Sequence, residues 1–127
     1  MYNVAVSMIV TDEKTGKILL IQQYGKLTYI LVAGYVNRGE AEEDAVVREV
    51  REETGLHVSH MKFNRTSFFE PSNTLMCNFT AYVDNAEELH INQEVDRCKW
   101  FPPEEARTNI RPNSLAEYFL KSYLDER

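Results

Sequence analysis

The stretch REVREETGL, residues 48–56, places three glutamates, Glu49, Glu52 and Glu53, within a single five-residue span. It ends a longer segment, residues 41–54, in which Ala and Val recur at helical spacing among strong helix formers. With about 100° of rotation per residue, the three glutamates fall within an arc of roughly 100° beside the apolar stripe. The sequence therefore predicts a helix over residues 41–54 with three carboxylates crowded on one face.

Such crowding needs a counter-charge, because like charges one turn apart destabilise a helix and do so more where water is partly excluded. A divalent cation would offset the repulsion, since Mg²⁺ prefers oxygen ligands and is commonly held by a few carboxylates together with substrate phosphates. The alternative to a metal site is an acidic helix face that is simply exposed to water. That alternative suits Glu42, Glu43 and Asp44, since acids in a first helical turn are favoured by the helix dipole, and we assign them no chemistry.

The spacing around the glutamates favours a functional site. Reading outward gives Gly34, five residues, Glu40, seven residues and then residues 48–56. This arrangement resembles the Nudix box of the Nudix hydrolases at every defined position from Gly34 to Leu56. Nine specified positions arise from composition alone with a probability on the order of one in a million or less.

Strand and helix patterns surround the box. The chain has 127 residues, of which 43% are hydrophobic, enough for one core, so we expect a single Nudix domain over residues 1–127. The predicted fold class is α+β, and the resemblance implies a Nudix-type α/β/α sandwich with a mixed β-sheet. Strands are predicted at residues 2–10, 18–24, 28–36, 56–63, 74–83 and 95–101, a helical turn at 102–106 and a helix at 113–124.

The resemblance implies divalent-metal-dependent hydrolysis of the diphosphate linkage in a nucleoside diphosphate derivative, by attack of water on phosphorus. Mg²⁺ or Mn²⁺ is the implied cofactor, which would neutralise the phosphate oxygens and lower the pKa of the water. By position, Glu49 and Glu53 are the implied main metal ligands, and Glu52 supplies a further ligand or a bridging water. The general base stays open between Glu49 and a carboxylate outside the box.

Two carboxylates outside the box are considered for the metal site. Glu94, in QEVDRCKWF, resembles the acid that completes the metal site ahead of a strand ending in Trp-Phe in many Nudix domains. Glu70 is a weaker alternative. A solvated loop carboxylate is the competing interpretation for Glu94.

The remaining box residues have expected supporting roles. Gly34 would let the backbone run close to a substrate phosphate, and Gly55 would end the helix in a left-handed cap. Arg48, grouped with the catalytic glutamates, has a planar fork of donors that would clamp Glu40 or Glu52 and hold the preceding loop against the helix.

The segment TSFFEPSNTLMCNFTAYV, residues 66–83, bears on the substrate. It loosely resembles the stretch that follows the box in NADH pyrophosphatases, with Phe69 at an aromatic position, although the specific core of that motif is replaced. Pro71 stands close to where ADP-ribose pyrophosphatases carry a proline. Both resemblances favour NADH, NAD or ADP-ribose-like substrates, and Phe69 is the expected substrate contact. Phe68, Tyr29 and Tyr35 are other aromatic residues that could stack on a base.

Charge and composition limit the partners. The formal net charge of −6 argues against broad binding to nucleic acid or to an anionic membrane, so a small nucleotide diphosphate is the expected partner. No apolar run reaches membrane-spanning length and no signal-peptide pattern is present, which makes the cytoplasm the expected location. Cys77 and Cys98 lack Cys-x-x-Cys spacing and are expected to be buried thiols. The resemblance also allows a homodimer.

Two other functions within the superfamily compete with hydrolysis. One is a nucleotide-sensing domain without catalysis, but such domains often lose box carboxylates, and this chain retains all of them. The other is isomerisation of an isoprenyl diphosphate, which depends on a reactive cysteine, and neither Cys77 nor Cys98 lies in a matching arrangement.

Overall fold

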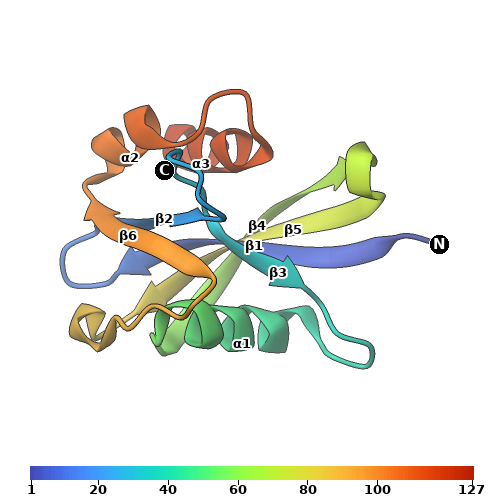
Figure 1. Cartoon of the computed structure of the whole chain (residues 1–127), viewed down its shortest axis with the longest axis horizontal. Helices are drawn as coiled ribbons and strands as arrows, with labels where there is room; N and C mark the ends of the chain where they lie inside the picture. The colour runs from blue at the N-terminus through green and yellow to red at the C-terminus, as the bar shows by residue number, and fades with distance from the viewer.

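Six strands form one mixed β-sheet, and helices cover both of its faces (Figure 1). The computed structural model describes residues 1–127. The elements in chain order are β1 (Asn3–Asp12), β2 (Ile18–Gln23), β3 (Val32–Tyr35), α1 (Glu42–Thr54), β4 (Val58–Phe69), η1 (Glu70–Ser72), β5 (Thr74–Val83), η2 (Ala86–Glu88), β6 (Val95–Phe101), α2 (Pro103–Asn109) and α3 (Leu115–Glu126).

Strand β1 is at the centre of the sheet, whose order is β4-β5-β1-β2-β6, with β3 also paired to β1. Only the β1–β5 pair is parallel, and the other pairs are antiparallel. One edge of β1 is divided between two partners, because Ala5–Met8 pair with β3 and Val10–Thr11 pair with β2. Strands β2 and β3 therefore leave β1 at different points along one edge.

Two hydrophobic clusters lie on opposite faces of the sheet, as the alternation of strand side chains requires. On one face, Val6 and Met8 of β1 pack with Val46 and Val50 of α1. On the other, Ile9 packs in the cluster that contains the α3 residues Phe119, Leu120 and Leu124. Figure 1 shows α1 below the sheet and α2 and α3 above it. The predicted α+β class and the three-layer sandwich are confirmed.

Some predicted boundaries were wrong. The strand predicted at 56–63 continues to Phe69, since its partner β5 extends the pairing to Phe69 and Thr74 through two irregularities of register. The extended segment predicted at 28–36 is a strand only over Val32–Tyr35. The turn predicted at 102–106 becomes the longer helix α2.

The two cysteines are free thiols in the β-sheet. Cys77 is buried and Cys98 is half-buried. Burial raises the pKa of Cys77 to about 12, with Glu42 as a lesser cause, so its thiol is protonated at neutral pH. None of the helices has the length and apolarity needed to cross a bilayer.

Candidate active site

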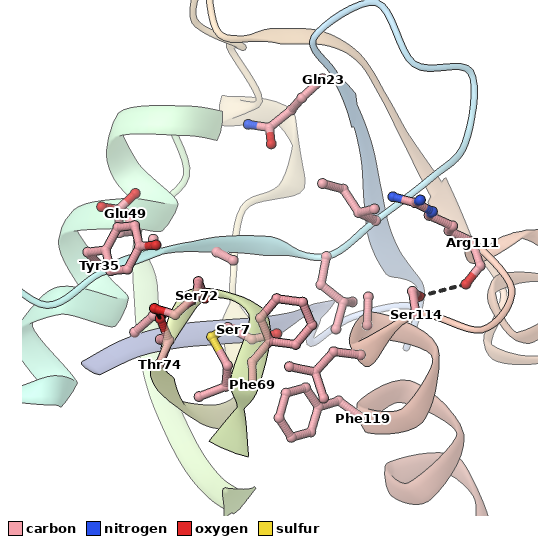
Figure 2. Close-up of a pocket in the computed structure, with 18 of the residues that line it drawn as sticks. Ser7, Gln23, Tyr35, Glu49, Phe69, Ser72, Thr74, Arg111, Ser114 and Phe119 are labelled. Carbon is pink, nitrogen blue, oxygen red and sulfur yellow. Dashed lines mark hydrogen bonds between the residues drawn. The ribbon is translucent and has the colours of Figure 1, made fainter. Parts of the chain in front are cut away.

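A pocket of about 710 Å³ runs along the sheet between the glutamate face of α1 and the start of α3. Three of the predicted metal ligands, Glu49, Glu53 and Glu94, line it. Figure 2 shows Glu49 at one side of the pocket, with Phe69 and then Arg111 farther along. The 23 residues that line it are Ala5, Ser7, Gln23, Tyr24, Ile30, Leu31, Ala33–Tyr35, Asn37, Glu49, Glu53, Phe69, Ser72, Thr74, Met76, Glu94, Arg111, Asn113–Ala116 and Phe119.

Glu53, in the last turn of α1, is the buried carboxylate of the group, with only 4% of its surface exposed. Its Oε1 accepts a hydrogen bond from Gln23 Nε2 at 2.9 Å, whereas its buried Oε2 has no partner. Burial, followed by the nearby Glu49 and Glu94, raises the pKa of Glu53 to about 8, and the bond from Gln23 opposes this shift. The ionised form of Glu53 therefore needs a positive partner.

Glu49 lies directly across Gly34, at the contact between α1 and β3. A Cβ atom built on Gly34 would stand 2.1 Å from Cδ of Glu49, well inside van der Waals contact. The φ angle of Gly34 is not positive, so what requires glycine here is space. Gly34 lines the pocket, and it leaves room for the Glu49 carboxylate.

Arg48 clamps Glu40 in the manner predicted. Its Nε donates to Glu40 Oε2 at 2.8 Å and its Nη2 to Glu40 Oε1 at 2.9 Å. The same Nη2 donates to the carbonyl of Tyr35 at 3.0 Å, and Nη1 donates to Glu49 at 2.8 Å. Hydrogen bonding to Arg48 is the main cause that lowers the pKa of Glu40 to about 2. Arg48 is not among the pocket-lining residues, so the geometry gives it a positioning role.

The other predicted site residues lie outside the pocket lining. The side chain of Glu52 is 56% exposed and lies 3.3 Å from Arg48 Nη1. Glu70 is exposed in η1. Gly55 has φ of 75° and donates its N–H to the carbonyl of Arg51, which confirms the left-handed C-cap.

The loop before β6 carries Glu94 to the pocket. Asn92, in this loop, donates through Nδ2 to the carbonyl of Glu52 at 2.9 Å, and its Oδ1 accepts from the N–H of Glu94 at 2.9 Å. Asn92 therefore ties Glu94 to the last turn of α1. Neither Asn92 nor Gln23 belongs to a recognisable motif, and the sequence reasoning missed both.

Two of the four aromatic residues considered for stacking reach the pocket. Tyr35 and Phe69 line it and are 56% and 39% exposed. Phe68 packs edge-on against Tyr2, and Tyr29 packs edge-on against Phe101 at a centroid distance of 5.1 Å. Of these four, Tyr35 beside Glu49 and Phe69 farther along the pocket are therefore placed to contact a bound ring.

The donor set of the pocket fits Mg²⁺ or Mn²⁺. Glu49, Glu53 and Glu94 supply carboxylate oxygens, the donors that these cations prefer, and Glu53 Oε2 is buried without a partner. No three acidic, His or Cys side chains of the chain converge closely enough to enclose an ion by themselves. Such an incomplete cage suits Mg²⁺, which usually retains waters and takes substrate phosphates as further ligands.

Sequence comparison finds curated relatives of this chain. One curated relative, the NAD-capped RNA hydrolase NudC of Pseudomonas syringae pv. syringae (strain B728a), is 29% identical over 126 residues. The alignment covers 98% of this chain but 45% of the relative, so the chain spans about half the length of the relative.

Solved structures share the fold. The Ap4A hydrolase of C. elegans, in a binary complex, superposes with a TM-score of 0.77 at 21% identity, covering 96% of both chains. The NUDIX domain of Shewanella oneidensis NrtR, complexed with ADP ribose, superposes with a TM-score of 0.79 at 16% identity, covering 99% of this chain and 88% of that one. The sequence profile of the NUDIX domain matches residues 1–121, and with the complete box and this fold the chain belongs to the Nudix family.

Proposed function

We propose that this chain hydrolyses the diphosphate linkage of a nucleoside diphosphate derivative of the NAD or ADP-ribose kind, with a divalent metal as cofactor. One observation carries the proposal: Glu53 holds a buried, unpartnered carboxylate oxygen in a pocket that Glu49 and Glu94 also line. The pocket volume of about 710 Å³ lies within the range usual for small-molecule sites.

Each residue of the glutamate end has a chemical role in this proposal. Bound Mg²⁺ or Mn²⁺ would neutralise the diphosphate oxygens and lower the pKa of the attacking water. Glu49, Glu53 and Glu94 would hold the metal. Gln23 donates a hydrogen bond to Oε1 of Glu53, so Oε2 would remain free to coordinate the metal. Glu49 and Glu94 are the two assignments for the general base, because both line the pocket and a base must reach the water.

The substrate class is supported by the curated relative, which is named for an NAD-capped substrate. A dinucleotide of this kind carries two flat ring systems joined by a diphosphate, and Tyr35 and Phe69 provide flat surfaces in the pocket. The net charge of −6 favours a free dinucleotide over an RNA, so NAD and an NAD-capped RNA are the informative pair to compare.

The first test measures turnover of NADH, NAD, ADP-ribose, ADP-sugars, dinucleoside polyphosphates, nucleoside triphosphates and NAD-capped RNA with Mg²⁺ or Mn²⁺. We expect Glu53→Gln to lower kcat by a factor of about 10³ or more, because it removes a charged metal ligand. Glu43→Gln, an exposed acid on the same helix, is the matched control and should retain wild-type turnover. Wild-type turnover in folded Glu53→Gln would refute the metal assignment, and binding without hydrolysis by the wild type would indicate a nucleotide sensor.

A second variant distinguishes the two roles open to Glu94. As a metal ligand, Glu94→Gln raises the Mg²⁺ concentration needed for half-maximal activity by about tenfold. As the general base, it lowers kcat by about 10²–10⁴-fold and flattens the acidic limb of the pH profile. Titration of Mn²⁺ binding by electron paramagnetic resonance separates these outcomes, and no effect in any measurement removes Glu94 from the site.

A further inference from the structure

Arg111 is the single basic residue among those that line the pocket, and every other charged lining residue is a glutamate. Figure 2 shows Arg111 and Ser114 on one side of the pocket and Glu49 and Tyr35 on the opposite side, with Phe69 between them. The pocket is therefore negative at one end and positive at the other.

The backbone of Arg111 is held firmly in place. Its N–H donates to the carbonyl of Tyr29 at 2.9 Å, and its own carbonyl accepts from Ser114 Oγ at 2.6 Å. The preceding residue, Ile110, is buried and forms an isolated β-bridge with Tyr29. These contacts fix the point from which the side chain extends into the pocket.

The guanidinium group of Arg111 makes no hydrogen bond or ion pair with the rest of the chain, in contrast to Arg48, Arg65 and Arg107. Glu117, one of the two acids nearest to it in sequence, is already engaged by the N–H of Asn113 at 3.0 Å and by Lys121 Nζ at 3.1 Å. Arg111 therefore keeps its donors available to a ligand.

We propose that Arg111 forms a subsite for a second anionic group of the substrate, a carboxylate or a phosphate, at the end of the pocket opposite the diphosphate. The guanidinium fork matches both groups with paired, charge-assisted hydrogen bonds. A diphosphate bound at the metal end and an anion bound at Arg111 would fix the direction of the substrate in the pocket. The inference rests on the proposed function for the placement of the diphosphate.

Three matched pairs of compounds test the subsite, each adding one anion to a parent compound. Nicotinic acid adenine dinucleotide adds a carboxylate to the NAD framework in place of the carboxamide. NADP adds a phosphate on the adenosine ribose of NAD, and ADP-ribose 1″-phosphate adds one on the terminal ribose of ADP-ribose. The pair that shows a preference identifies the anion and its position.

We expect the wild type to prefer the anionic member of at least one pair by roughly five- to tenfold in kcat/KM, the effect of one partly exposed charge-assisted bond. Arg111→Gln should bring that ratio close to one. Arg97→Gln, which removes an exposed arginine outside the pocket lining, should keep the wild-type ratio. The subsite is refuted by ratios near one for all three pairs in the wild type, or by a preference that persists in Arg111→Gln.

A binding measurement separates failure of this inference from failure of the proposed function. Calorimetric titration of the Glu53→Gln background, with and without Arg111→Gln, reports the affinity for each pair without turnover. If the wild type hydrolyses no compound, the proposed function fails. An affinity ratio that depends on Arg111 still supports the subsite in that case, and a ratio independent of Arg111 refutes it.

Discussion

At the residue scale, the site depends on how closely the backbone of Gly34 approaches the carboxylate of Glu49. The space that a methyl group would need is already filled by the end of the Glu49 side chain. Because that end is flexible, the fold can accept a methyl group there, but the carboxylate must move away from its position in the pocket.

We therefore expect Gly34→Ala to lower kcat by about tenfold or more while changing the free energy of unfolding little, since small displacements of a catalytic group are costly to turnover. Steady-state kinetics and urea unfolding measure the two effects. An alanine variant with full activity would show that the position of Glu49 is not critical.

Glu53 gives the protein a pH dependence whose sign follows from its environment. Its pKa is raised from 4.5 to about 8 in the folded protein, so the folded state binds this proton more tightly than the unfolded state. The associated stability is fully present below about pH 4.5 and is lost as the pH rises to about 8.

In the presence of a metal chelator, this group should make the free energy of unfolding larger at pH 6 than at pH 9. Added Mg²⁺ should increase the free energy of unfolding more at pH 9 than at pH 6. Glu53→Gln should remove most of both effects, whereas Glu43→Gln should preserve them. Urea unfolding at a series of pH values provides the measurement, and identical profiles for wild type and Glu53→Gln would contradict the assignment.

At the element scale, the Arg48–Glu40 clamp joins the loop before α1 to the helix that carries the glutamates. Because Arg48 also donates to the carbonyl of Tyr35, it fixes both ends of residues 36–39. The clamp therefore holds β3, the loop and α1 together as one unit.

Glu40→Gln should weaken this unit, because the neutral amide cannot form the paired, charged contact. We expect faster amide hydrogen exchange at residues 37–39 and a several-fold loss of kcat, with little change in the exchange of β1. Arg51→Gln, which removes an exposed arginine of the same helix, is the control. Unchanged exchange in the loop of Glu40→Gln would show that the clamp does not order it.

The elements that could be predicted from sequence are those that form because of residues close together in the chain. Helix α1 has periodic apolar residues, a glycine cap and a complete box, and the structure places it within a residue of the prediction. The extension of β4 to Phe69 has no such local pattern, because it follows from pairing with β5. Gln23, Asn92 and Arg111 reach the site only through contacts between distant segments, which no spacing rule reveals.

At the scale of the whole molecule, the pocket collects residues from nearly the entire chain, from Ala5 in β1 to Phe119 in α3. Its glutamate end depends on α1 on one face of the sheet, and its Arg111 end depends on the packing of α3 on the other. Correct placement of the charges along the pocket therefore requires both helical layers to be packed.

The parallel pairing of β1 with β5 has a consequence for folding. Asn3 pairs with Thr74 and Asp12 with Val83, so the central strand of the sheet pairs with a strand about 70 residues later in the chain. Contacts of such long sequence separation must close a large loop before they stabilise anything, which slows folding. During synthesis, the apolar strand β1 stays without this partner until Val83 has left the ribosome, and an unpaired apolar strand is prone to aggregation during that interval.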